Sequence, residues 1–162
     1  MYRRISALLL VVLAISGLAA VASAKSKATK HKVSATVQLA TISQASNFPA
    51  VGSTTTDAGI VKSKPGGRGA ETDTLKVTAT PAAGQLTLSG TATLFFVKGT
   101  EKAKVTILAV VAADGSVTYT GSGTFSSGTG TYKGITGNVT FTGGSPAGSN
   151  VVTLQVKGSA KY

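Results

Sequence analysis

The chain has 162 residues, of which 13% are charged, and its 16 basic residues against 5 acidic ones give a formal net charge of +11. It contains no Cys, which excludes disulfide frameworks, thiolate metal sites, iron–sulfur clusters and cysteine nucleophiles. A single His excludes multi-histidine metal centres and disfavours a Ser-His-Asp hydrolase, and the length fits one domain.

Residues 1–24 have the pattern of a secretory signal peptide. Arg3 and Arg4 give a basic start, Ile5 to Ala22 is almost wholly apolar, and small residues up to Ala24 form a cleavage site. We therefore expect a secreted or cell-envelope protein with no membrane span after cleavage. A retained anchor is the alternative, because 18 apolar residues nearly span a bilayer. The absence of Cys in an exported chain favours a bacterial source.

Residues 25–32 are expected to form a flexible basic leader ahead of the folded domain. Clustered lysines bind polyanions by releasing counterions, so this leader is a candidate contact for an anionic cell-envelope polymer; a solubilising role is the alternative. Specific nucleic-acid recognition is disfavoured, because one Arg remains after cleavage and no aromatic residue is interleaved with the lysines. The candidate polyanion contacts are Lys25, Lys27, Lys30 and Lys32.

Residues 33–162 alternate apolar and polar side chains, which is the period of strands and not of helices. A tight connection at Pro81–Gly84 predicts a hairpin, and Asp114-Gly115 predicts a type I′ turn. About eight strands joined by hairpins predict an all-β domain, and we favour an eight-stranded antiparallel barrel over a sandwich because closure removes unpaired edges. The expected strands are 33–42, 59–62, 74–80, 85–94, 104–113, 117–120, 138–142 and 152–161.

Strand parity places a set of apolar side chains on the inner face of this barrel. An eight-stranded barrel is either filled by side chains or holds one small ligand, so the set forms a packed core or lines a pocket. No inward charge is expected, which favours a lipid-like or aromatic ligand. The candidate ligand-binding residues are Phe96, Val105, Ile107, Tyr119, Phe141, Leu154 and Val156.

Glu71, Asp73 and Glu101 are the candidate catalytic residues. Glu71 and Asp73 share a strand parity, and two close carboxyls can separate their pKa values and act as an acid–base pair. We expect all three near strand ends, and the Glu71–Asp73 pair solvated beside Arg68 and Lys76, so a non-enzymatic role is favoured. No metal and no cofactor is expected.

Three segments resemble the allene oxide cyclase and dirigent barrel family: the glycine-rich Gly128–Gly137, the approach Gly59–Gly69, and the final Gly158–Tyr162. The resemblance covers about residues 33–162 and implies an eight-stranded antiparallel barrel with a central apolar cavity. Members of that family cyclise an unsaturated fatty-acid epoxide or steer the coupling of phenoxy radicals. They use acidic residues in the cavity, and dirigents also use Arg and Tyr. No residue of this chain matches those functional motifs.

The favoured function is that of a secreted barrel that binds a small apolar ligand or has another non-enzymatic role. One alternative is an envelope-interaction protein whose lysine-rich leader docks on anionic polymer while the barrel serves as a rigid head. Another is a cofactor-free lipid cyclase or isomerase, which would need a carboxylate inside the barrel.

Overall fold

The computed structural model describes residues 28–162; the predicted signal peptide, Lys25 and Lys27 lie outside the described residues. Eight strands follow one another, with one short 3-10 helix, η1, between the sixth and the seventh. The elements are β1 (Lys30–Gln44), β2 (Thr54–Lys64), β3 (Gly67–Ala79), β4 (Gln85–Phe96), β5 (Gly99–Val111), β6 (Val117–Gly128), η1 (Gly130–Tyr132), β7 (Thr136–Ser145) and β8 (Val151–Lys161).

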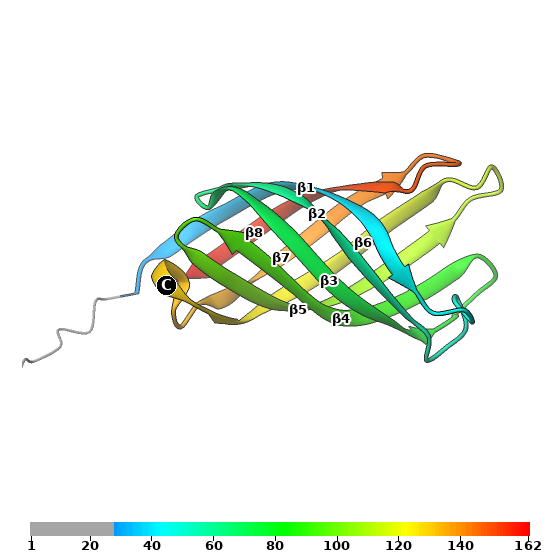
Figure 1. Cartoon of the computed structure of the whole chain (residues 1–162), viewed down its shortest axis with the longest axis horizontal. Helices are drawn as coiled ribbons and strands as arrows, with labels where there is room; N and C mark the ends of the chain where they lie inside the picture. Colours follow the sequence, from blue (N-terminus) through cyan, green and yellow to red (C-terminus); the bar gives the residue numbers. More distant parts are fainter. Residues whose placement is uncertain (1–27) are drawn as a thin grey trace, which may run out of the picture.

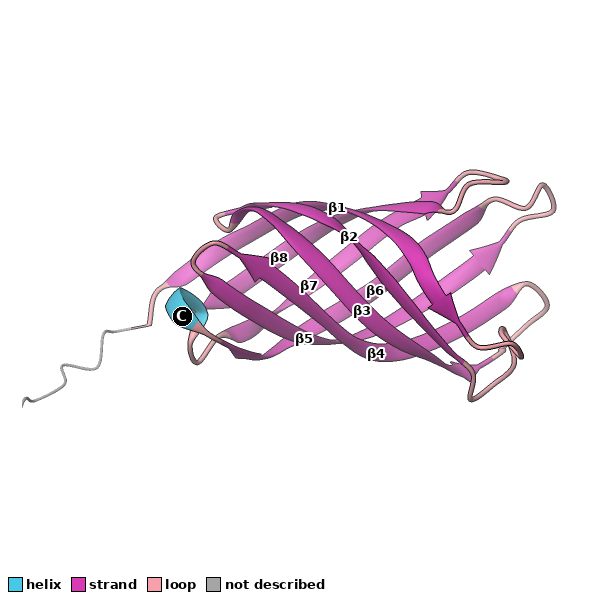
Figure 2. Ribbon diagram, viewed as in Figure 1, coloured by secondary structure: helices cyan, strands magenta, loops and turns pink. Residues whose placement is uncertain are grey.

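The strands form a closed antiparallel barrel. Each strand pairs with its neighbours in sequence, and β1 pairs with β8 to complete the circle. Figure 1 shows the strands wrapping obliquely around the long axis of the molecule, and Figure 2 shows turns and loops joining them at both ends. The predicted eight-stranded antiparallel barrel is confirmed.

Alternation of side chains explains the core. In β3, Leu75 and Val77 are 6% and 0% exposed, whereas the intervening Lys76 faces solvent. In β8, Leu154 is buried and the flanking residues Thr153 and Gln155 belong to the opposite face. The two-residue period therefore places the apolar side chains of all strands around one shared interior.

Several strands begin earlier than predicted. β1 begins at Lys30, so Lys30 and Lys32 belong to the barrel wall, opposite Lys161 and Ser159 of β8, and not to a flexible leader. β3 begins at Gly67, seven residues before the predicted start. The early positions carry glycine or charged side chains, so the apolar alternation that marks a strand is missing there although the backbone pairs normally.

The turn at Asp114-Gly115 is not type I′. Among the described residues no non-glycine residue has a positive φ, so Asp114 does not take the left-handed conformation that this turn type requires. Gly115 alone does, at φ 82°, and closes a three-residue loop in which the Ala112 amide donates to the Ser116 carbonyl at 2.9 Å. The Asp114 carboxylate accepts from the amide and the hydroxyl of Ser116, at 2.9 and 2.7 Å, which stabilises this loop instead.

The two ends of the barrel differ. The closed end is formed by the β2–β3 and β4–β5 turns, the segment 129–135, the start of β1 and the end of β8 (Figure 1). The open end carries the turns 45–53, 80–84, 112–116 and 146–150.

An aromatic cap, made of His31, Phe96, Tyr132 and Tyr162, covers the closed end. The ring centroids of Phe96 and Tyr132 are 5.7 Å apart, those of Tyr132 and Tyr162 5.1 Å apart edge to face, and His31 stacks on Tyr162 at 4.5 Å. Edge-to-face and offset contacts of this kind are favourable for aromatic pairs. Tyr132, only 2% exposed, is the centre of the cap.

Gly130 allows the Tyr132 ring to reach the aromatic cap. Gly130 has φ 56°, and a Cβ at this position would lie 2.2 Å from the carbonyl oxygen of Lys98. Only glycine therefore allows η1 to pack against the β4–β5 turn. The glycine-rich segment Gly128–Gly137 contains this single turn of 3-10 helix.

Candidate functional site

The barrel interior contains two adjoining cavities. The mouth chamber, of about 200 Å³, lies toward the open end, and the deep chamber, of about 70 Å³, lies between it and the aromatic cap. Asp73, Ile107 and Leu154 line both chambers and mark the boundary between them. Gln44 and Val111 line the mouth chamber beside open-end turns and are exposed, so solvent reaches this chamber from the open end.

Six of the seven side chains predicted to line a pocket face one or both chambers. The seventh, Phe96, packs against Tyr132 in the aromatic cap and lines neither chamber. The six are Val105, Phe141 and Val156 in the deep chamber, Tyr119 in the mouth chamber, and Ile107 and Leu154 in both.

The three candidate carboxyls lie inside the barrel. Glu71, Asp73 and Glu101 are 8%, 6% and 9% exposed, so the prediction of an interior without charge and of a solvated pair near strand ends was wrong. Because β3 begins at Gly67, Glu71 and Asp73 fall in its body, on the same inward face as Leu75. All three side chains line the deep chamber, and Asp73 also reaches the mouth chamber.

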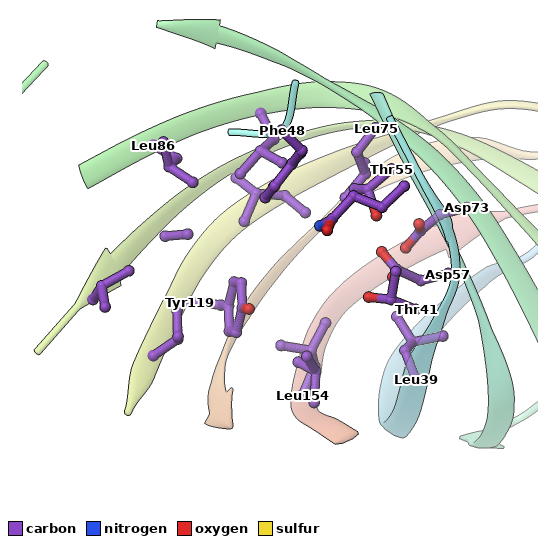
Figure 3. Close-up of a pocket in the computed structure, with 17 residues that line it drawn as sticks. Leu39, Thr41, Phe48, Thr55, Asp57, Asp73, Leu75, Leu86, Tyr119 and Leu154 are labelled. Carbon is purple, nitrogen blue, oxygen red and sulfur yellow. The ribbon is translucent and has the colours of Figure 1, made fainter. Parts of the chain in front are cut away.

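Sequence reasoning missed a fourth interior carboxyl, that of Asp57. It lies on β2 directly opposite Asp73 on β3 and lines the mouth chamber. Figure 3 shows the two carboxyl groups turned toward each other at one wall of this chamber. Asp57 is on the same face of β2 as the buried Thr55 and Val61. Extending the predicted strand backwards from Gly59 would have placed Asp57 on the inner face.

The environment of Asp73 keeps it protonated. Burial, followed by the negative charges of Asp57 and Glu71, raises the pKa of Asp73 to about 8. Its Oδ1 atom is buried and, within the described residues, has no hydrogen-bond partner, the one side-chain atom for which this holds. At neutral pH the Asp57–Asp73 pair therefore combines a protonated carboxyl with an unused hydrogen-bonding position.

Burial also shifts the other titratable groups of the interior. It raises the pKa of Glu71 and that of Glu101 to about 7. The pKa of Tyr119 is raised by burial and then by the charge of Asp57, and that of Tyr132 by burial and then by the charge of Glu101. Neither chamber is lined by Lys, Arg or His, so no cation offsets these carboxyls there.

In chemical terms the interior offers a proton donor beside a carboxyl acceptor, within apolar walls. Within residues 28–162 no group of three or more His, Cys, Asp or Glu side chains is placed to hold a metal ion. In the same part of the chain, no helix has the length and apolar character needed to cross a membrane.

The cationic side chains gather at the closed end. Of the twelve Lys and Arg in the described part of the chain, eleven lie in closed-end turns or on the closed-end halves of their strands. Lys76, near the open end of β3, is the twelfth. The eleven are Lys30, Lys32, Lys62, Lys64, Arg68, Lys98, Lys102, Lys104, Lys133, Lys157 and Lys161.

Comparison of the sequence with protein-family models and with curated proteins gives no match. The structure nevertheless defines the fold. The chain is an eight-stranded antiparallel β-barrel with two internal chambers.

Proposed function

We propose that the protein binds a small, largely apolar molecule in the mouth chamber. The observation that carries this proposal is a cavity of about 200 Å³, open to solvent at one end and lined mainly by apolar side chains. Ligand sites are typically apolar pockets with a few placed polar groups, here Asp57, Asp73 and Tyr119. An engineered apolar cavity of about 150 Å³ holds benzene, so a single ring with a short substituent suits this chamber.

Filling the mouth chamber is expected to weaken binding of a fluorescent single-ring probe such as methyl salicylate. Ala109 is 3% exposed and lines only the mouth chamber, so Ala109→Leu reduces the space available and should lower probe affinity at least tenfold. Fluorescence titration of the folded protein measures this affinity.

The matched control is Ala103→Leu, because Ala103 is 4% exposed and lines only the deep chamber. This variant is expected to bind the probe as the unaltered protein does. Equal affinities in all three proteins, or no binding at millimolar probe, would contradict the proposal.

Membership of the allene oxide cyclase and dirigent barrel family is part of this proposal, supported by the barrel fold and by carboxyls inside it. A cofactor-free cyclase or isomerase is the enzymatic form, since Glu71, Asp73 and Glu101 supply the interior carboxyl that such chemistry needs. A long-chain fatty-acid epoxide is too large for a chamber little bigger than one that holds benzene. The cavity size therefore favours binding of a small molecule over the reaction known for the family.

A second candidate function is docking on an anionic polymer of the cell envelope, after secretion. The clustering of eleven cations at the closed end favours it, because these charges act together as one positive surface. The open end then faces away from the polymer and stays accessible to ligand. Lys30 and Lys32, two of the contacts proposed from the sequence, belong to this surface.

Replacing closed-end cations should weaken retention on immobilised dextran sulfate. The variant Lys62→Gln removes one charge from this surface and is expected to elute at a clearly lower salt concentration. Lys76→Gln is the control, because Lys76 lies toward the open end, and it should elute with the unaltered protein. Equal losses in the two variants would indicate a response to net charge alone and contradict a localised docking surface.

A further inference from the structure

The carboxyl pair of the mouth chamber has a definite place within it. Asp57 and Asp73 face each other across adjacent strands, and Asp73 also lines the deep chamber, so the pair lies at the inner end of the mouth chamber. Partly exposed apolar side chains such as Leu86 lie at the outer end. A molecule that enters from the open end therefore meets apolar walls first and the carboxyls last.

We propose that the mouth chamber binds an apolar primary amine, with its ammonium group between the carboxyls of Asp57 and Asp73. This inference rests on the proposed function and names the class of ligand. The ring or short chain of the amine lies along the apolar walls toward the open end.

Hydrogen bonding supports an amine as the ligand. An ammonium group carries three N–H donors and no acceptor, so it matches a site composed of carboxyl oxygens. The Oδ1 atom of Asp73, in a side chain that is 6% exposed, is buried without a partner among the described residues. In the proposed complex the Asp73 side chain turns so that one ammonium N–H bonds to its carboxyl, and a second N–H bonds to the Asp57 carboxyl opposite.

Charge supports the same class of ligand and excludes its opposite. Four carboxyls face the two chambers, from Asp57, Glu71, Asp73 and Glu101, and no Lys, Arg or His lines either one. A carboxylate ligand would add a further negative charge to this desolvated group, which is strongly unfavourable. A cationic head replaces the missing counter-charge, so the chamber selects amines over carboxylic acids of the same shape.

Binding of an ammonium group is linked to loss of a proton from the protein. The titratable groups around Asp73 are Asp57 on β2, Glu71 on β3 and Tyr119 on β6. Asp73 is protonated at pH 7 in the free protein, and a cation beside it favours its ionised form. The amine enters as R–NH₃⁺, the Asp73 carboxyl gives its proton to the solvent, and the charge of the chamber is unchanged overall.

The test compares three molecules of similar size on the folded protein: 2-phenylethylamine, 2-phenylethanol and phenylacetate. Calorimetric titration at pH 7, in two buffers of different ionisation enthalpy, gives both the affinity and the number of protons released. We expect the amine to bind at least tenfold more tightly than the alcohol, with release of close to one proton, and phenylacetate to bind more weakly than either.

Substitutions of Asp57 and Asp73 test whether this pair binds the ammonium group. Asp73→Asn and Asp57→Asn should each lower the affinity for the amine at least tenfold, and Asp73→Asn should abolish proton release. Asp114→Asn removes an exposed carboxylate of the 112–116 turn that lines neither chamber, and it should leave the affinity for the amine nearly unchanged.

If 2-phenylethanol binds as tightly as the amine, or phenylacetate binds more tightly, the inference is wrong while the binding of small apolar molecules stands. If none of the three molecules binds, the proposed function fails with it. Amine binding without proton release and without any effect of Asp73→Asn would likewise overturn the assignment of this pair.

Discussion

The barrel is expected to lose stability as the pH rises from 5 to 8. In the folded chain the pKa values of Glu71 and Glu101 are raised to about 7 and that of Asp73 to about 8, all chiefly by burial, from ordinary values of 4.5 and 3.8. Between these limits the folded state holds protons that the unfolded chain has lost, so the free energy of unfolding falls with increasing pH. The stabilisation of the folded state by these protonated carboxyls is fully present below about pH 4 and is lost as the pH rises through 7 to 8.

The pKa shift of Glu71 alone shows how large this loss of stability should be. For Glu71, which is 8% exposed, the difference between a pKa of 4.5 and one of about 7 corresponds to about 3 kcal/mol. Over pH 5 to 8 the unfolding temperature should therefore fall by on the order of 10 °C. Thermal unfolding followed by circular dichroism at constant ionic strength measures it.

Amide substitutions assign the loss to the interior carboxyls. Glu71→Gln replaces a group that ionises with one that does not, so this variant should be more stable than the unaltered protein at pH 8 and show a smaller dependence on pH. Asp114→Asn is the control, because Asp114 is exposed in a turn and its hydrogen bonds with Ser116 lower its pKa. A stability that rises from pH 5 to pH 8, or an unchanged dependence in Glu71→Gln, would show that these carboxyls are not buried as described.

The same carboxyls explain where the sequence is informative and where it is not. In β8, regular alternation of Val152, Leu154 and Val156 with polar residues defines the strand and its inner face correctly. In β2 and β3 the inward positions carry Asp57, Glu71 and Asp73, so the alternation that reveals a strand is broken at the candidate site itself. A site made of polar residues on a core face removes the pattern by which that face is recognised.

The cluster of closed-end cations and the aromatic cap could not be predicted, because their residues are far apart in the sequence and come together only in the closed barrel. The closed-end cations are spread from Lys30 to Lys161 along the chain, and they meet at one end because the strands alternate in direction around the barrel. The aromatic cap likewise joins His31, Phe96 and Tyr132, which have no common spacing in the sequence. Parity places Phe96 inside correctly, but it does not tell how far along the barrel axis the ring lies.

Removal of the central ring of the cap is expected to be strongly destabilising. Tyr132 is 2% exposed and contacts the rings of Phe96 and Tyr162, so Tyr132→Ala leaves a cavity at the closed end. Truncation of a buried aromatic side chain costs about 3–5 kcal/mol, which is a large part of the stability of a single domain. Urea unfolding at pH 5, where the carboxyls are protonated, measures this loss separately from their ionisation.

Tyr132→Ala should also reduce the dependence of stability on pH. Glu101 lies close enough to the cap for its charge to raise the pKa values of Tyr132 and Tyr162, and burial raises the pKa of Glu101 itself. With the ring removed, water reaches Glu101 and its pKa falls toward 4.5, so stability should depend less on pH between 5 and 8. Tyr132→Phe keeps the ring and should preserve both the stability and its pH dependence. A loss below about 1 kcal/mol in Tyr132→Ala would mean that the cap does not seal the barrel.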